Sequence, residues 1–339
     1  MKASQYNWEI VGHQKVINHL QGSIDSGNLA HAYIFTGPAH LGKKLVMEKF
    51  IASVLCHDYH QGKKKEIPCK ICPPCKQLEK NIHPDVYWVK KDEEKMDITI
   101  EQIRELKEKL SLSSFLNSYK IAVIEEAEKM NESSQNALLK ILEEPAKKTI
   151  IILLTADYSL LLPTIISRSR LIKFHRIKSD LIFDHLISLG ASREQARSLT
   201  QLANGRQGLA LDYFHHQELF EQYQEKTKLF FQVLGGELYE KFNLVDSLVT
   251  KGAKMAENIP LVAENLNLWQ LLLRDMLFVK LGLEEYVSNY LVITNLRQSV
   301  EKYQSAKLIT MIKNIDQIKR YLERNVNLSL ALENLVLSF

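Results

Sequence analysis

Two short stretches of this sequence hold residues whose types and spacing could do chemistry. The first, GPAHLGKK, has Gly37, Gly42 and Lys43 at the spacing of a phosphate-binding P-loop. In such a loop, backbone N–H groups close around phosphates, the lysine contacts the β- and γ-phosphates, and a following Ser or Thr hydroxyl ligates magnesium. Lys44 stands at that hydroxyl position. Because an ammonium group offers no lone pair and repels a cation, we expect ATP hydrolysis at this loop to be crippled.

An acidic pair would complete the same site. The segment KIAVIEEAEKM places Glu125 and Glu126 directly after an apolar run. In a working ATPase, an Asp at the first position orients magnesium and a Glu at the second activates water. Solvated acids at the end of a strand explain the pair equally well, just as a chance glycine-rich turn is the alternative to a P-loop. We expect a degenerate site that binds nucleotide weakly or not at all.

The second stretch gathers all the cysteines of the chain. They follow the pattern C-x12-C-x2-C-x2-C, and they are Cys56, Cys69, Cys72 and Cys75. Soft thiolates this close together predict a closed, structural zinc site, for which His57 or His60 is a substitute ligand. An iron–sulfur cluster is an alternative, although Glu79 stands where a further Cys-Pro is expected, and four unligated thiols are another.

A third candidate lies in LLLPTIISRSRLIKF, where Arg168 falls between a helical stretch and a strand. The residue is either an ordinary solvated charge at a helix end or an arginine finger that reaches the γ-phosphate of ATP bound by a neighbouring subunit. Periodicity does not distinguish these two roles.

The elements that must position these residues form an alternating pattern in the first half of the chain. Short β-branched runs predict strands at 32–36, 85–89, 120–126, 149–156 and 169–175. Helical stretches separate them, as at 98–110 and 133–144, and Pro145 is expected to stop the second of these. This order is typical of a parallel sheet covered by helices. After about residue 176 the apolar residues recur at helical spacing, and the rest is expected to be all α.

Composition sets broad limits. The chain has 339 residues, 45% of them hydrophobic, and a formal net charge of +4. We expect two or three domains, no membrane span and a cytoplasmic location, while the small charge does not by itself indicate nucleic-acid binding.

Together these residues carry a resemblance that covers essentially the whole chain. The stretches VGHQKVINHLQGSIDSGNLAHAYIFTGP, QNALLK followed by ILEEP, LLPTIISRSR and NVNLSLALENLVL, with the inserted cysteines, resemble the delta prime clamp-loader subunits of bacterial DNA polymerase III, an AAA+ family. The resemblance implies an AAA+ domain at 1–175 with a zinc insertion at 56–75, a helical lid at 176–214, and an all-α collar at 215–339.

The resemblance also implies roles for single residues. Arg168 matches the arginine finger of the family's Ser-Arg-Cys motif, although Ser169 replaces the Cys. Motor subunits carry a sensor Asn where Thr155, Ala156 and Asp157 stand, and a lid sensor Arg where GRQGLAL has Gly208; Arg206 is a poor substitute.

The implied function is that of a non-hydrolytic subunit within the DNA polymerase III holoenzyme. Its partners would be gamma or tau ATPase subunits and the delta subunit, and through them the sliding clamp and primed DNA. The rival interpretation is an active gamma- or tau-like motor ATPase that uses Lys43, Glu125 and Glu126. A stand-alone zinc DNA-binding module is weaker, because the cysteine stretch lacks a second pair and a basic stripe.

Overall fold

The computed structural model describes residues 5–92, 97–114, 118–249, 255–322 and 327–339. The chain divides into two compact units, Met1–Ile182 with Gly205–Gly208, and Phe183–Asn204 with Leu209–Phe339. The predicted lid at 176–214 contributes residues to both units, and the division into three domains remains a prediction. Asn325 and Val326, which open the quoted C-terminal motif, lie outside the described residues.

The N-terminal unit is built on a five-stranded parallel sheet in the order β4-β5-β6-β2-β7. Its strands are β2 (Ala32–Thr36), β4 (Val86–Val89), β5 (Lys120–Ile124), β6 (Thr149–Thr155) and β7 (Arg170–Lys173). All five predicted strands are confirmed, with ends shifted by a few residues. Because the strands are parallel, their carboxyl ends share one edge of the sheet, and residues that follow different strands meet there.

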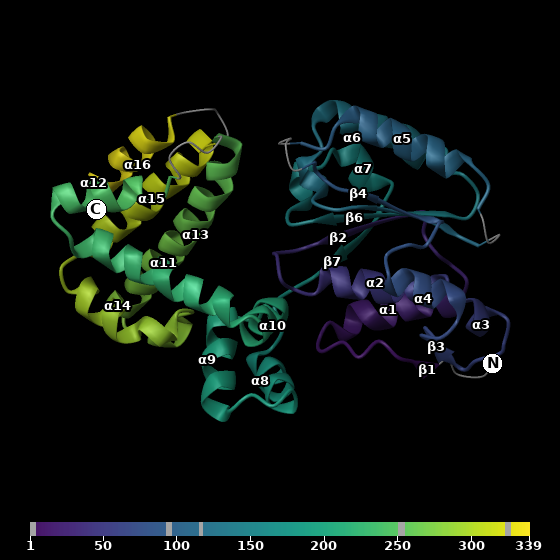
Figure 1. The fold of residues 1–339 in the computed structure, drawn as a ribbon, viewed down its shortest axis with the longest axis horizontal. Coiled ribbons are helices and arrows are strands. Elements are labelled where there is room, and N and C mark those ends of the chain that lie inside the picture. Colours follow the sequence, from purple (N-terminus) through teal and green to yellow (C-terminus); the bar gives the residue numbers. More distant parts are fainter. Residues whose placement is uncertain (1–4, 93–96, 115–117, 250–254, 323–326) are drawn as a thin grey trace. The chain divides into compact units, whose positions relative to one another are not determined.

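Helices cover both faces of this sheet (Figure 1). One face carries α1 (Gln14–Asp25), α2 (Lys43–Val54) and α4 (Pro73–Glu79), and the other carries α5 (Ile100–Ser111), α6 (Glu132–Glu143) and α7 (Pro163–Ser167). Strand alternation supplies both cores: Phe35 packs toward α2, whereas Ile34 packs toward α5 and α6. Short elements fill the connections: α3 (His57–His60), η1 (Ala127–Lys129) and η2 (Tyr158–Leu160).

A small second sheet links the amino-terminal segment to the cysteine stretch. In it, β1 (Gln5–Tyr6) pairs in parallel with β3 (Glu66–Ile67). The buried Trp8 follows β1, and its indole N–H donates to Ser53 Oγ of α2 at 2.9 Å. These contacts attach the cysteine stretch to the body of the unit.

The second unit is helical throughout its described residues, as predicted. Two helices, α8 (Ser179–Ser188) and α10 (Gln207–His215), cross the boundary between the units. The other helices of this unit are α9 (Arg193–Ala203), α11 (Gln217–Gly235), α12 (Leu238–Asp246), α13 (Met255–Lys280), η3 (Glu284–Tyr286), η4 (Tyr290–Val292), α14 (Ile293–Val300), α15 (Ser305–Leu322) and α16 (Leu328–Val336). The predicted apolar stripes of α13 and α15 form its core, around Trp269. Among the described residues, no helix is both long and apolar enough to cross a bilayer.

Candidate functional site

The P-loop lies between β2 and α2, where the sequence predicts it. Gly42 caps α2 with a φ of 86°, which glycine adopts readily. A Cβ on Gly37 would lie 2.5 Å from the carbonyl oxygen of Phe174, so only glycine fits there. The Gly37 N–H donates to Thr155 O of β6 at 3.3 Å. Both glycines are therefore required by the fold itself, whether or not phosphate binds.

Lys43 contacts the loop from which it comes. Its ammonium group donates to Gly37 O, and to Pro38 O at 2.8 Å. Burial lowers the pKa of Lys43, and the carboxylate of Glu128 partly offsets that effect. The cation that would contact the β- and γ-phosphates is thus directed at the carbonyls of its own loop.

An ion-pair cluster joins the residue at the expected hydroxyl position to the first acid after β5. Lys44 Nζ lies 2.9 Å from Glu125 Oε1, and Lys90 Nζ lies 3.2 Å from Glu125 Oε2. Both ammonium groups lie over the Trp88 ring, at 5.5 and 5.6 Å from its centroid. The residue at the hydroxyl position and the residue at the metal-orienting position therefore neutralise each other directly.

The remaining acids near this edge differ from a working site. Glu126 is exposed, has a φ of 49° and precedes η1. Glu128, which the sequence analysis missed, accepts a hydrogen bond from Ala156 N at 3.1 Å and lies close enough to Lys43 to influence its pKa. The three acids of EEAEK could have indicated Glu128, because a 3₁₀ turn after the strand brings the third acid back toward the strand ends.

Gly208, the residue that the resemblance aligns with the lid sensor arginine, packs against the backbone of the P-loop. The Gly208 N–H donates to His40 O at 2.8 Å, and a Cβ on Gly208 would lie 2.8 Å from that oxygen. Arg206 precedes α10, which begins at Gln207. The position aligned with the sensor arginine thus has no room for a side chain.

Arg168 lies at the amino ends of the parallel strands, whereas the P-loop lies at their carboxyl ends. It ends α7 and precedes β7, whose first residue, Arg170, pairs with Tyr33 near the start of β2. The guanidinium Nη2 lies 2.9 Å from Glu143 Oε1, and Nη1 donates to Thr164 O at 3.2 Å. Since parallel strands keep their two edges apart, Arg168 does not serve the P-loop of its own chain.

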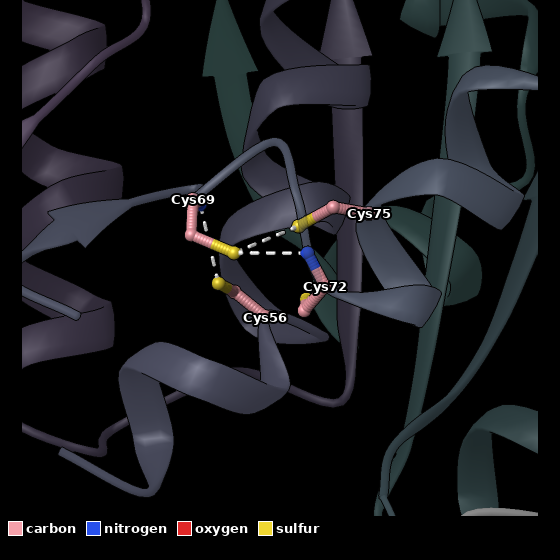
Figure 2. A group of neighbouring side chains, drawn as sticks. All are labelled: Cys56, Cys69, Cys72 and Cys75. Carbon is pink, nitrogen blue, oxygen red and sulfur yellow. Dashed lines mark hydrogen bonds between the residues drawn. The ribbon is translucent and has the colours of Figure 1, made fainter. Parts of the chain in front are cut away.

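The four cysteines come together as one group (Figure 2). Their sulfur atoms all lie within 4.8 Å of one another, with 4.0 Å between Cys69 and Cys75, and all four side chains are buried. Four thiolates around a zinc ion at about 2.3 Å would be separated by about 3.8 Å, so the group has the size of a tetrahedral site. The stretch can therefore hold a metal ion.

Hydrogen bonds and burial act in opposite directions on the ionisation of these thiols, and burial raises the pKa of Cys69. The backbone N–H of Cys69 donates to Cys56 Sγ at 3.3 Å, and that of Cys72 donates to Cys69 Sγ at 3.4 Å. A hydrogen bond from the Cys75 thiol lowers the pKa of Cys56 to about 5, and the same contact raises the pKa of Cys75. A bound cation would let all four ionise.

The two candidate substitute ligands point elsewhere. His57 contacts Asp58 and Gln61, and His60 Nε2 lies 3.1 Å from Ser53 O. Neither histidine belongs to the described group of ligand atoms. The donor set is thus four sulfur atoms.

Comparison with known proteins places the whole arrangement in a family. The model described as "DNA polymerase III, delta subunit" matches residues 12–178, and "DNA polymerase III, delta subunit, C terminal" matches 243–339. A DNA polymerase III subunit delta' from Bacillus subtilis is 28% identical over 323 residues, which cover 95% of this chain and 94% of that protein. The chain belongs to the DNA polymerase III delta' family.

Other similar proteins match different shares of the chain. The delta' subunit of Pseudomonas aeruginosa is 37% identical over 139 residues, 41% of each chain. The tau subunit of Bacillus subtilis is 30% identical over 174 residues, 51% of this chain and 30% of that protein. A solved gamma subunit-related protein from Thermotoga maritima is similar with a TM-score of 0.43 at 20% identity, over 95% of this chain and 97% of that chain.

Proposed function

We propose that this member of the delta' family is a non-hydrolysing subunit of the DNA polymerase III clamp loader. The observation that carries the proposal is the ion pair between Lys44 and Glu125. Mg²⁺ is bound by oxygen ligands and bridges the phosphates during phosphoryl transfer. An ammonium group on that carboxylate removes both the ligand and the space for the ion.

The contribution of this chain to ATP hydrolysis is then Arg168, offered to ATP on a neighbouring motor subunit. Its position at the edge opposite the P-loop supports action in trans. By relationship to the family, the neighbours are gamma or tau ATPase subunits and the delta subunit. The assembly loads the sliding clamp onto primed DNA, with residues 1–175 as the AAA+ domain, 176–214 as the lid and 215–339 as the collar.

A reconstituted clamp loader tests the arginine finger. We would replace Arg168 with Ala, and separately with Lys, and measure ATP turnover in the presence of clamp and primed DNA. An arginine finger contributes about 10³-fold or more to hydrolysis at the site it reaches. Turnover equal to wild type in the Ala variant would end the proposal. The isolated wild-type chain serves as the control, and magnesium-dependent turnover by it would favour the motor-ATPase alternative.

We propose zinc as the metal of the cysteine group and assign it a structural role. Cys56, Cys69, Cys72 and Cys75 would be its ligands, and a four-sulfur set leaves no open position for a reacting molecule. Metal analysis of the purified chain should give one equivalent of zinc. Chelation should lower the melting temperature. Iron with visible absorbance would instead identify a cluster.

A further inference from the structure

The guanidinium of Arg168 is held by acceptors on two different helices. Glu143, the last residue of α6, contacts Nη2 at 2.9 Å, and the Thr164 carbonyl of α7 accepts from Nη1 at 3.2 Å. The Arg168 side chain remains 37% exposed. Its direction is therefore fixed while part of it still faces solvent.

The same helix α6 also fixes the start of α7. The buried amide of Gln135 donates to Leu160 O at 3.3 Å, and its oxygen accepts from Leu162 N at 2.8 Å, just before α7 begins at Pro163. Gln135 thus anchors the beginning of the short helix, and Glu143, two turns further along α6, anchors the side chain at its end.

The count of donors leaves room for a phosphate. A guanidinium carries five N–H donors in one plane. The two contacts to Glu143 and Thr164 use one N–H on each terminal nitrogen, so that Nε–H and one N–H on each of those nitrogens remain. An arginine side chain carries large rotamer freedom, and a contact that orients it beforehand removes that cost from the transition state.

We propose that Glu143 is a positioning residue for Arg168, which sets the guanidinium direction before a neighbouring subunit's ATP is reached. This inference rests on the finger role proposed above. Glu143 touches neither substrate nor phosphate and acts only through Arg168. Removing its charge should therefore lower kcat of the assembled complex and leave the KM for ATP unchanged, because the finger stabilises charge that develops in the transition state.

The experiment uses the reconstituted complex with primed DNA and clamp, and four versions of this chain: Glu143→Gln, Arg168→Ala, the double variant, and the matched control Glu144→Gln. Glu144 is the exposed neighbour that caps the carboxyl end of α6. We expect about a fivefold loss of kcat for Glu143→Gln, comparable with the strength of one exposed ion pair, and an unchanged rate for Glu144→Gln. In the Arg168→Ala background, Glu143→Gln should cause no further loss.

Each other outcome has a defined meaning. If Arg168→Ala lowers turnover but Glu143→Gln does not, or raises it, the positioning role is overturned and the finger role stands. An additional loss in the double variant would show a general structural effect and would also overturn the inference. If Arg168→Ala itself has no effect, the finger role fails and the inference fails with it. Melting temperature and assembly with the partners, measured for every variant, must equal wild type for the loss to count.

Discussion

The two charged regions at opposite ends of the strands of the N-terminal sheet pair their charges differently. At the P-loop edge, Lys43 binds carbonyls of its own loop and Glu125 is shared by two ammonium groups. At the other edge, Arg168 is oriented by one carboxylate and remains partly exposed. Both regions pair their charges within the chain, but in the first one carboxylate is shared by two ammonium groups, whereas in the second one guanidinium has a single carboxylate partner.

The glycines of the P-loop have structural roles that do not depend on bound phosphate. Gly37 has no room for a Cβ beside Phe174, and Gly42 has a left-handed φ at the start of α2. These requirements belong to the packing of β2 and α2. The Lys44 side chain, by contrast, is 53% exposed and pairs with Glu125.

The largest expected effect is on ATP hydrolysis, and it compares Arg168 with Lys43 of the P-loop. In the reconstituted complex, Arg168→Ala should reduce hydrolysis at the adjacent ATP site by about 10³-fold, while Lys43→Ala in the same chain should leave it unchanged. Single-turnover hydrolysis with each variant measures both values. A comparable loss for Lys43→Ala would mean that the P-loop of this chain still handles nucleotide.

Gly208→Ala should disrupt the close contact between Gly208 and the P-loop backbone. The new Cβ would lie 2.8 Å from His40 O, a backbone atom, so the loop or α10 must shift, and we expect about 2 kcal/mol of destabilisation. Chemical denaturation of the full chain measures this. Gly22→Ala is the matched control: it lies in α1 with open space around its Cβ position, and it should be neutral or slightly stabilising. Equal effects would contradict the proposed close packing.

Glu125→Ala should show how far the ion-pair cluster stabilises the P-loop edge. It leaves Lys44 and Lys90 close together without their shared carboxylate, but both lysines are more than half exposed and solvent screens the repulsion. We expect a loss of about 1 kcal/mol, against less than about 0.5 kcal/mol for the exposed Glu126→Ala. No difference between the two would show that the cluster contributes little to stability.

Ser169→Cys tests the packing of the residue that follows Arg168. The Ser169 hydroxyl oxygen is buried and finds no hydrogen-bond partner among the described residues. A thiol loses less on burial than a hydroxyl, so the variant should be more stable by about 0.5–1 kcal/mol. The melting temperature of the purified chain gives the answer, and Ser167→Cys, nearby and exposed, is the control. A less stable Ser169→Cys variant would argue against the unsatisfied hydroxyl.

The smallest effect concerns pH at the P-loop edge. His13 Nε2 contacts Leu41 O at 2.8 Å, and burial lowers the pKa of His13 below its usual 6.5, partly offset by this hydrogen bond. The unfolded chain therefore binds more protons, so the stability from His13 is complete above pH 6.5 and is lost as pH falls below it. His13→Asn, which tolerates the left-handed backbone at this position, should flatten the decline in unfolding free energy between about pH 6.5 and 5. An unchanged slope would exclude His13 as its source.

Much of this protein was predictable from local pattern. The five strands and α6 follow from β-branched runs, helical periodicity and Pro145, and the Asn131 side chain caps α6 by accepting from Ser134 N. Residues that act across elements were missed. Lys90 follows β4 and meets Glu125 only because β4 and β5 are parallel neighbours in the sheet. The quoted ILEEP contains Glu143, but nothing local pairs it with Arg168.

The sequence alone determined the α/β unit followed by helices, the P-loop frame with Lys44 in place of a hydroxyl, and four cysteines close enough to share one ion. These properties depend on residue type and short spacing, which a chain carries before it folds. Only the tertiary structure decided that Lys44 pairs with Glu125, that Gly208 closes on the P-loop backbone, and that Arg168 lies at the far edge on Glu143. Strand order and the side on which each connection returns set those contacts, and neither is written in any single stretch of sequence.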